Sequence, residues 1–417
     1  MQTIKLYTAI VCSFCLATNS RAQTISLDTV LMKIKTNNPQ LKMYDADILS
    51  MNAAAKGAKS WMPPQVSTGF FMTPYNSEMW KTNSANPGMG SYMLGFTQMI
   101  PNQSKLKADF NYMNAMSSVE AENKNYTINQ LYALAKTNYN QWIIIDKKIN
   151  VLKENLALID YMVKSMEIRY EYNMDKLPSY YKAKSQYRSF QNMIVMLEND
   201  RSQKKIMLNT LMAVDKGSVF EIDTNYNLLD IKSFQYDTSI LAKNRSDLHA
   251  IENTINLNNL KIEVEKKQYL PEFGVRYDHM FAFGNRPQLF NLMGMVTIPM
   301  PWSTKMNTAT IESYKIKNES LKFQKEMTLN EATGMLESMK VEFENAKRQL
   351  DNTNNYIIPS LKNNYSTALI AWQNNTGDLF IVLDAVEALN MAQNDALDKL
   401  QMLLTIQVEI EKQLEIK

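Results

Sequence analysis

Apolar residues recur at alternating spacings of three and four along a long stretch in the first half of the chain. The series comprises Trp142, Ile145, Ile149, Leu152, Leu156, Ile159, Val163 and Met166. The positions between them are rich in Lys, Asn, Gln and Glu, so a helix here would carry one apolar stripe. This pattern is typical of long helices packed as coiled coils. Some 50 residues of helix would extend roughly 75 Å, which suits an elongated structure.

A different pattern, strict alternation of apolar and polar positions, predicts strands near residue 280. The apolar set is Phe273, Val275, Tyr277, His279, Phe281 and Phe283, and the set between them is Gly274, Arg276, Asp278, Met280, Ala282 and Gly284. Residues 66–72 and 94–96 repeat the pattern more weakly. Strands of about 10 residues with one apolar face fit a transmembrane barrel wall, and they fit a half-buried sheet equally well. Four strands cannot close a barrel, so the membrane alternative requires an oligomer.

Proline and glycine, which interrupt regular structure, are concentrated in two zones, 63–101 and 271–301. Residues 102–177 and 302–358 contain no proline, and Pro359 is the single proline of the stretch 302–417. The distribution predicts two strand pairs carried between long helices.

The first 22 residues predict a secretory signal peptide. Lys5 precedes an apolar run from Leu6 to Ala17, and Ser20-Arg21-Ala22 supplies a small-x-small cleavage site. Both cysteines of the chain lie in this segment, and neither follows the pattern of lipoprotein processing, so no disulfide and no lipid anchor are expected. Beyond the segment there is no apolar run of about 18 residues. The formal net charge of +3 does not favour nucleic acid as a partner.

Several landmarks occur twice at a nearly constant offset, which indicates an internal duplication. Met62-Pro63 returns as Leu270-Pro271, and residues 168–183 align with residues 370–385. The predicted order in each half is helix, strand, strand, long helix, long helix. The predicted parts are the signal peptide at 1–22, a first repeat at 23–213, a linker at 214–240 and a second repeat at 241–417.

Short motifs distributed along both halves resemble those of the TolC-type outer-membrane efflux ducts. They are Asn-Asn-Pro at 37–39, Asn-Arg-Ser-Asp-Leu at 244–248, Tyr-Leu-Pro at 269–271, Ile-Pro-Met-Pro-Trp at 298–302 and Val-Leu-Asp-Ala at 382–385. The family usually has proline where Ser246 stands. The resemblance covers essentially the whole mature chain. It implies a mainly helical protein with a transmembrane β-barrel, in which long coiled-coil hairpins form a trimeric α-barrel and two β-hairpins per chain form a 12-stranded β-barrel.

The resemblance also implies a function. The chain is expected to be the passive exit duct of a tripartite efflux system in the outer membrane, as a homotrimer with its helices in the periplasm. An inner-membrane pump and a periplasmic adaptor are its expected partners, besides outer-membrane lipid. Metal cations or small toxic compounds are the expected cargo. The alternatives are a periplasmic adaptor or a coiled-coil structural protein of the cell envelope without a pore.

In the family, the aligned segments of the two repeats form turns that dock the adaptor. The resemblance assigns this role to Arg169, Asn173 and Met174 in the first repeat and to Asn375, Thr376 and Gly377 in the second. Asn and Gly tolerate the left-handed backbone that reverses a helix, so these residues also fit a turn without any docking role. The family commonly has Gly where the two asparagines stand. Pro178, close to the first turn, is expected to kink the helix that follows.

The family places an acidic residue at the position of Asp384, facing the lumen at the closed periplasmic end. A trimer would then gather three carboxylates, which attract cations. A second acidic position of the family is Ile381 here, and Asp378 lies one turn nearer the turn of the hairpin. The alternative is an ordinary surface aspartate on a helix. Lys182 occupies the position equivalent to Asp384 in the first repeat.

The residue types needed for catalysis are scarce. The two histidines, His249 and His279, lie in different segments, and no nucleophile or phosphate-binding motif is present. We therefore expect no enzyme, no catalytic residue, no cofactor and no metal site. The sequence leaves open whether some of the 29 methionines bind copper. Thioethers are soft ligands for Cu(I), but methionine is also a flexible filler of apolar cores.

Overall fold

The computed structural model describes residues 23–84, 87–172, 177–228 and 238–415. The predicted signal peptide lies outside the described residues. The chain divides into two compact units, each built from segments that are distant in the sequence. Among the described helices, none combines the length and the apolar composition needed to span a membrane.

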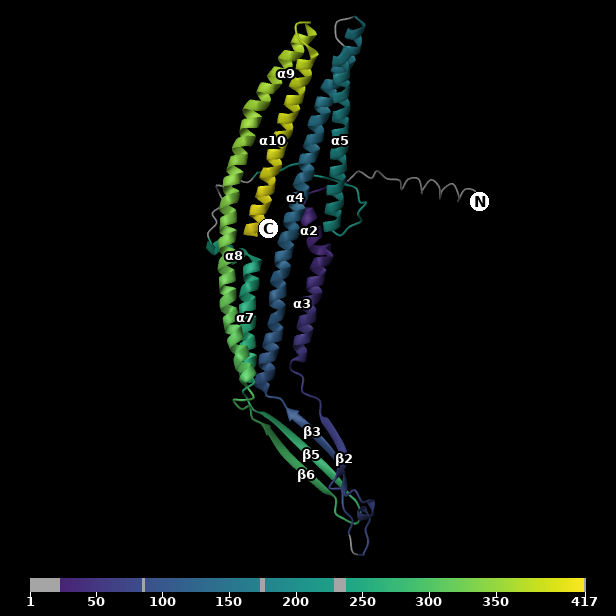
Figure 1. Ribbon diagram of the computed structural model, residues 1–417, viewed down its shortest axis with the longest axis vertical. Helices are drawn as coiled ribbons and strands as arrows, with labels where there is room; N and C mark the ends of the chain where they lie inside the picture. The colour runs from purple at the N-terminus through teal and green to yellow at the C-terminus, as the bar shows by residue number, and fades with distance from the viewer. Residues whose placement is uncertain (1–22, 85–86, 173–176, 229–237, 416–417) are drawn as a thin grey trace, which may run out of the picture. The chain divides into compact units, whose positions relative to one another are not determined.

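The first unit comprises residues 1–42, 126–245 and 331–417. Its elements are β1 (Gln23–Ile25), α2 (Leu27–Asn37), α5 (Leu177–Leu211), β4 (Phe220–Ile222), α6 (Thr238–Asn244), η3 (Thr353–Ile357), α9 (Ile358–Gln373), α10 (Leu379–Leu414), the later part of α4 (Gln103–Glu171) and the end of α8 (Lys305–Asn352). The unit contains the whole of the long helices α5 and α10 and parts of α4 and α8 (Figure 1).

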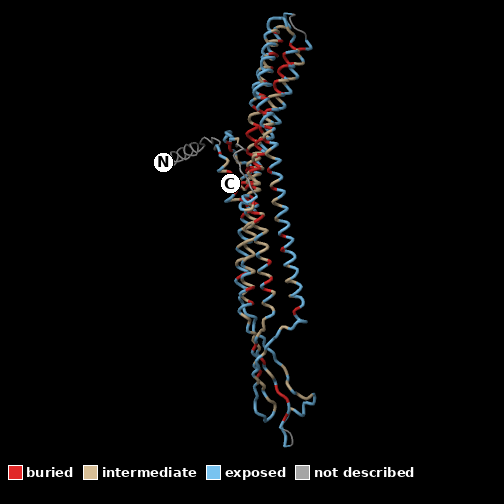
Figure 2. Tube along the Cα trace, turned by 90° about the vertical axis from the view of Figure 1, so that its left-hand side faces the viewer, coloured by how far each residue is buried: buried red, intermediate tan, exposed pale blue. Residues whose placement is uncertain are grey.

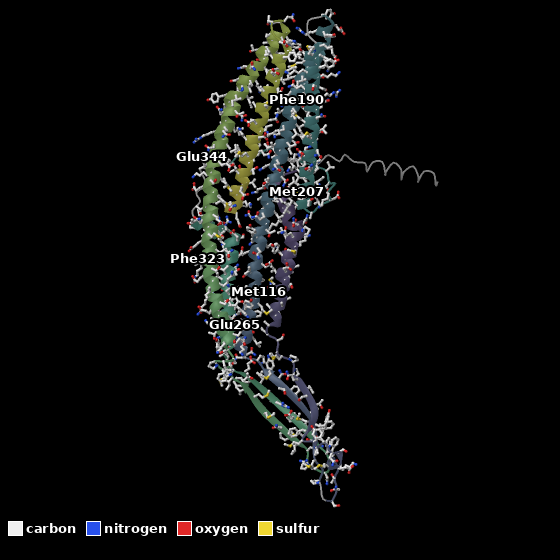
Figure 3. All side chains as sticks on the ribbon, in the orientation of Figure 1. Met116, Phe190, Met207, Glu265, Phe323 and Glu344 are labelled. Atoms are coloured by element: carbon white, nitrogen blue, oxygen red, sulfur yellow. The ribbon has the colours of Figure 1, made fainter. Side chains whose placement is uncertain are left out.

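The predicted apolar seam forms the core between these helices. Six of its residues are buried: five of them form one cluster, against which Leu156 and Val163 are partly buried, and Trp142 lies in the neighbouring cluster. Helices α5 and α10 supply the opposing residues, among them Phe190, which Figure 3 labels on α5. The seam predicted from spacing is therefore confirmed, because the apolar stripe of α4 is the side that faces the other helices.

A second core cluster surrounds the beginning of the described chain. β1 pairs in parallel with β4, and Ile25 and Ile222 lie in this cluster with the start of α2. Asn38 stands between α2 and α3 (Pro39–Gly57). Its Oδ1 accepts from the Gln40 N–H at 2.9 Å, and its Nδ2 donates to the Leu211 carbonyl at 2.9 Å. The Asn-Pro pair thus caps one helix and ties it to α5.

Proline residues are accommodated without ending helices. Pro359 lies in the first turn of α9, and the five residues before α9, Thr353–Ile357, form a π-helical turn that joins α8 to α9. The wider π-helical turn leaves room for the proline ring, whose nitrogen cannot donate a hydrogen bond to the preceding turn. Pro178 is the second residue of α5, where no intrahelical partner for its nitrogen is needed.

The second unit comprises residues 43–125 and 246–330. It holds the rest of α3, the beginnings of α4 and α8, and a four-stranded antiparallel sheet of order β2-β3-β5-β6. The remaining elements are β2 (Gln65–Phe71), η1 (Ser77–Trp80), β3 (Ser91–Ile100), α7 (Ser246–Lys267), β5 (Glu272–Ala282) and β6 (Leu289–Thr297).

The sheet has two unlike faces. One face carries exposed apolar side chains from all four strands, including Phe70, Phe96, Phe273, Tyr277 and Leu292. The other carries mainly Ser, Thr, Gly, Asn, Met and the buried Asp278, with Phe71 and Leu289 at strand ends. Few strand residues are buried (Figure 2). The predicted alternation in 273–283 is therefore confirmed.

Polar contacts join the sheet to the helices of its own unit. The Lys105 Nζ lies 2.6 Å from Glu272 Oε1, and Asn102 Nδ2 donates to the Pro271 carbonyl at 3.4 Å. On the helical side, the Asn307 Nδ2 donates to Glu265 Oε2 at 2.7 Å, which links α8 to α7 (Figure 3). These contacts fix where each strand leaves its helix.

Each unit also contains asparagines hydrogen-bonded between helices inside otherwise apolar packing. In the first unit, Asn155 Nδ2 donates to Asn390 Oδ1 at 3.1 Å and to Gln393 Oε1 at 3.0 Å. In the second, Asn258 Nδ2 donates to Asn318 Oδ1 at 2.8 Å. Buried polar pairs of this kind specify the register between helices, because a shifted register leaves them unpaired.

The order of elements is similar in the two halves of the chain: helices, two strands, then long helices. The residue limits predicted for the repeats and their linker remain predictions.

Candidate functional site

The turn between α9 and α10 holds three of the residues singled out in the sequence. Asn375 has φ of 60°, in the left-handed region that Asn tolerates better than most residues. The N–H groups of Thr376 and Gly377 both donate to the Ala371 carbonyl, at 2.9 and 3.0 Å. A Cβ at Gly377 would lie 3.0 Å from the Ala371 Cβ, so the glycine permits this close approach. These contacts give the turn one defined conformation.

Asp378 ends this turn as the N-cap of α10. Its Oδ1 accepts from the Phe380 N–H at 2.9 Å, which satisfies one donor of the first turn of the helix. The side chain is exposed. The structure therefore gives Asp378 a structural task that the sequence analysis did not assign to it.

Arg169, near the end of α4, contacts the turn of the other hairpin. One guanidinium nitrogen donates to Asn375 Oδ1, and the guanidinium carbon lies 4.9 Å from the centre of the Trp372 ring. Trp372 is buried, so the cation stacks on an indole that is held in the core. Asn173 and Met174, the other residues predicted for the first turn, lie outside the described residues.

Asp384 lies on α10 opposite α5, and it meets Lys182. The Lys182 Nζ lies 2.7 Å from Asp384 Oδ1, and the side chains are 38% and 66% exposed. The two residues are 202 positions apart, which is the offset between the aligned segments of the two repeats. Equivalent positions of the duplicated unit thus form an ion pair, which no periodicity within one repeat could indicate. The Lys182 Nζ also lies 5.0 Å from the centre of the Phe380 ring.

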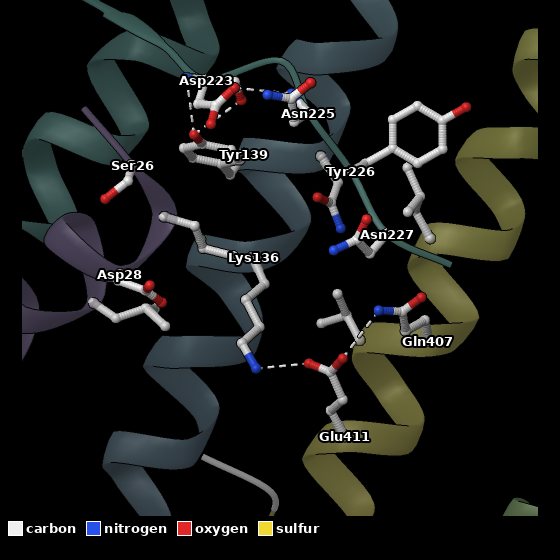
Figure 4. A pocket seen from close by; sticks show the side chains of 15 residues that line it. Ser26, Asp28, Lys136, Tyr139, Asp223, Asn225, Tyr226, Asn227, Gln407 and Glu411 are labelled. Carbon is white, nitrogen blue, oxygen red and sulfur yellow. Dashed lines mark hydrogen bonds and ion pairs between the residues drawn. The ribbon is translucent and has the colours of Figure 1, made fainter. Parts of the chain in front are cut away.

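A polar crevice of about 490 Å³ lies elsewhere in the first unit (Figure 4). Lys136 from α4 and Glu411 from α10 form an ion pair of 2.6 Å on its wall. The Tyr139 hydroxyl lies 3.0 Å from both the N–H and the carbonyl of Asp223. Its phenol is buried, which raises the pKa of Tyr139 to about 12. The sequence analysis did not identify this crevice, because its walls come from four separated segments.

Among the described residues, no group of three or more His, Cys, Asp or Glu side chains is placed to hold a metal ion. His279 contacts Gln288 and the Phe281 ring, and His249 lies near Glu122, so the two histidines do not share a site. The arrangement at the two hairpin ends is one of charge pairs and stacked rings.

Comparisons with known proteins agree with this fold. A family model described as "Outer membrane efflux protein" matches residues 30–214. A search of curated proteins finds no match. Solved structures with similar folds include CusC, at 15% identity and a TM-score of 0.74, with 95% of this chain and 94% of that chain covered. The outer membrane protein VceC of Vibrio cholerae is 14% identical, with a TM-score of 0.72 and coverage of 93% and 95%.

A further similar structure is the CmeC outer membrane channel of Campylobacter jejuni. It is 14% identical to this chain, with a TM-score of 0.70, and the match covers 93% of this chain and 85% of that chain. At such identities the likeness shows the fold, which extends over almost all of the chain.

Proposed function

Because residues 30–214 match the outer membrane efflux protein family model and the fold is that of solved outer-membrane channels, we propose that the chain is the passive exit duct of a tripartite efflux system in the outer membrane. In this function the protein does no covalent chemistry. It conducts compounds that an inner-membrane pump delivers through a periplasmic adaptor. Metal cations and small toxic compounds are the proposed cargo.

The observation that carries the proposal is the exposed apolar face of the four-stranded sheet. Aromatic side chains flank the sheet at both ends: Trp61, Tyr269 and Trp302 on the helix side, and Tyr75 beyond the end of β2. An apolar band between aromatic girdles is the pattern of strands that contact lipid. We propose that three copies join their sheets into one 12-stranded wall, because one sheet of four strands leaves two edges unpaired.

We also propose that Lys182 and Asp384, in the helical first unit, act in the gate of the duct. Their ion pair joins α5 to α10 when the duct is closed, and separation of these helices breaks it. Three copies would bring three such pairs together. Asp384 would also attract cations to this position. Asp378, six residues before Asp384, contributes a further negative charge in addition to capping α10.

We further propose that the hairpin turns dock the adaptor. The described part of this surface is Arg169 with Asn375, Thr376 and Gly377, and Asn173 and Met174 are proposed to complete it. The support is the hydrogen-bonded turn and the contact of Arg169 with the exposed Asn375, which joins residues of two hairpins, while the buried Trp372 holds the guanidinium in place.

Conductance in a planar bilayer tests the duct directly. The protein, extracted with detergent, should insert and give discrete conductance steps, and its mass in detergent should correspond to three chains. A periplasmic adaptor or a coiled-coil protein without a pore would give no conductance. A water-soluble monomer without conductance would therefore refute the proposal.

A transport assay in cells tests the docking surface separately. Thr376→Arg should abolish protection against exported compounds while bilayer conductance of the purified protein stays unchanged. Tyr356→Arg, at an exposed position of the same helical arm, is the matched control and should retain protection. Equal protection by both variants would remove Thr376 from the docking surface.

A further inference from the structure

The methionines of the sheet lie on one face only. The register of the strands places five of them on the polar face: Met93, Met99, Met280, Met293 and Met295. On the opposite, apolar face the same four strands carry Phe, Tyr, Leu, Ile and Val but no methionine.

This distribution is not what a general excess of methionine would produce. If methionine were used here as a generic apolar residue, it would share the apolar face with the leucines and phenylalanines, where packing and lipid contact are permissive. Instead it lies beside Asp278, Arg276 and Asn291, on a face whose other large apolar residues, Phe71 and Leu289, stand at strand ends. The placement therefore indicates a use for the thioether group.

Two methionines approach each other across a glycine. Met99 on β3 and Met295 on β6 are both register partners of Gly274 on β5. A Cβ at Gly274 would lie 2.7 Å from the Met99 sulfur and 3.1 Å from the Met295 terminal methyl carbon. The Met99 sulfur and the end of the Met295 side chain thus both lie over Gly274, from the strands on either side of it. Both side chains are partly exposed, so an ion can reach them.

A second pair lies on the same face. Met93 and Met280 are direct register partners on β3 and β5. Six residues along β3 separate Met93 from Met99, which corresponds to about 20 Å at 3.4 Å per residue. Between the pairs lies the Arg276–Asp278 ion pair, with 3.0 Å from the Arg276 Nε to each carboxylate oxygen.

We propose that Met99 and Met295 bind a soft monovalent metal cation, Ag(I) or Cu(I), and that Met93 and Met280 form a second such site on the same face. Thioether sulfur is a neutral, polarisable ligand that selects soft cations, and it does not bind hard ions such as Mg²⁺ or Ca²⁺ well. Neutral ligands bind such cations without the charge that would hold them too strongly for release.

The biological role of these metal sites rests on the proposed function. In a duct formed by three copies, the face opposite the lipid faces the lumen, so two levels of thioether pairs would line the path of the cargo. The proposal thereby names a soft monovalent cation as the substrate class.

Ag(I) binding to the full-length protein in detergent tests the site, with silver nitrate as the probe and calorimetry as the readout. The Met99→Leu/Met295→Leu variant should bind Ag(I) about tenfold more weakly, a loss of about 1.4 kcal/mol. Leucine preserves apolar volume, so the fold is retained. Met306→Leu/Met327→Leu replaces two exposed methionines of α8 and should bind as the original protein does.

Gly274→Ala provides an independent variant, because it removes no sulfur and fills the space between the two thioethers. It should also weaken Ag(I) binding. Absence of Ag(I) binding by the original protein, or an unchanged affinity in the Met99/Met295 variant, would overturn the inference. Retained affinity for an apolar dye together with lost affinity for Ag(I) would support it, since a merely apolar surface would bind both alike.

Conductance measured without silver separates the two proposals. If the protein conducts but does not bind Ag(I), only the proposal of the metal site is refuted. If the protein binds Ag(I) but never conducts, the duct proposal is refuted, and the methionine pairs stand as a metal-binding site on a sheet.

Discussion

The Tyr139 hydroxyl joins three segments that are distant in the sequence. It contacts the Ile25 carbonyl at 3.2 Å and both backbone groups of Asp223, so α4 is tied to the chain on either side of the β1–β4 pair. Because burial holds the pKa of this phenol near 12, the hydroxyl stays protonated throughout the physiological range.

Tyr139→Phe should lower the free energy of unfolding by about 1–3 kcal/mol, since the buried Ile25 carbonyl and the Asp223 backbone lose their hydrogen bonds to the hydroxyl. Thermal unfolding of the detergent-solubilised protein measures the change. Tyr132→Phe is the control, because the described part of the chain offers the Tyr132 hydroxyl no hydrogen bond, and it should change stability by less than about 0.5 kcal/mol. Equal effects would show that ring packing, and not the hydroxyl, matters.

Asp146 on α4 makes the stability of the folded chain depend on pH. Burial raises the pKa of its carboxyl, although Arg201 at 3.4 Å acts in the opposite direction. The folded chain therefore holds this proton more strongly than the unfolded chain. The resulting stabilisation is complete at low pH, and it is lost as pH rises through the folded-state pKa.

Asp146→Asn cannot ionise, so its melting temperature relative to the original protein should increase between pH 4 and pH 7. The two melting curves at each pH measure the difference. A difference that stays constant across this range would show that the carboxyl titrates alike in the folded and unfolded chain.

At the scale of elements, the asparagines between helices decide how α4 and α10 align. Asn155 and Asn390 are 2% and 7% exposed, and a slide of one helix past the other would leave their amides unpaired in the core. The apolar seam alone would allow shifts by whole heptads, because every heptad presents a similar stripe.

Asn155→Ala should therefore cost about 1–3 kcal/mol of stability, because the amide of Asn390 loses a partner and a small cavity remains. The double variant Asn155→Leu/Asn390→Leu removes both polar groups and should be less destabilised than the single one. Thermal unfolding gives the ranking of the two variants. The reverse ranking would mean that the hydrogen bond itself outweighs the cost of burying the amides.

At the scale of the whole molecule, the duplicated sequence places equivalent residues of its two halves opposite each other, and there they differ in charge. Lys182 and Asp384 illustrate this. A pair this exposed contributes less than about 1 kcal/mol, so it biases a gate and does not lock it.

Asp384→Asn should increase the open fraction of the channel by at most about fivefold and weaken block by multivalent cations. Single-channel recording measures both. The exchanged pair Lys182→Asp/Asp384→Lys should restore the original open fraction, because the attraction is re-formed in the opposite direction. An exchange that behaves like the single variant, or an unchanged block in Asp384→Asn, would contradict the role of the pair in the gate.

The sequence by itself determined the elements and their order. Spacings of three and four in α4, alternation in β5 and the clustering of prolines are local consequences of helix and strand geometry, so they could be read without knowing the fold. The turn at Asn375 was foreseeable for the same reason, since its residues carry the required backbone freedom.

Only the tertiary structure decided which of these elements meet. The pairing of β5 with β3 on one side and β6 on the other brings Met99 and Met295 to Gly274, and the packing of α5 against α10 brings Lys182 to Asp384. Arg169 reaches Trp372 by the same long-range packing. Periodicity reports which side of an element is apolar, but not the partner that covers it. That choice depends on contacts between residues some 200 positions apart, such as the 202 between Lys182 and Asp384.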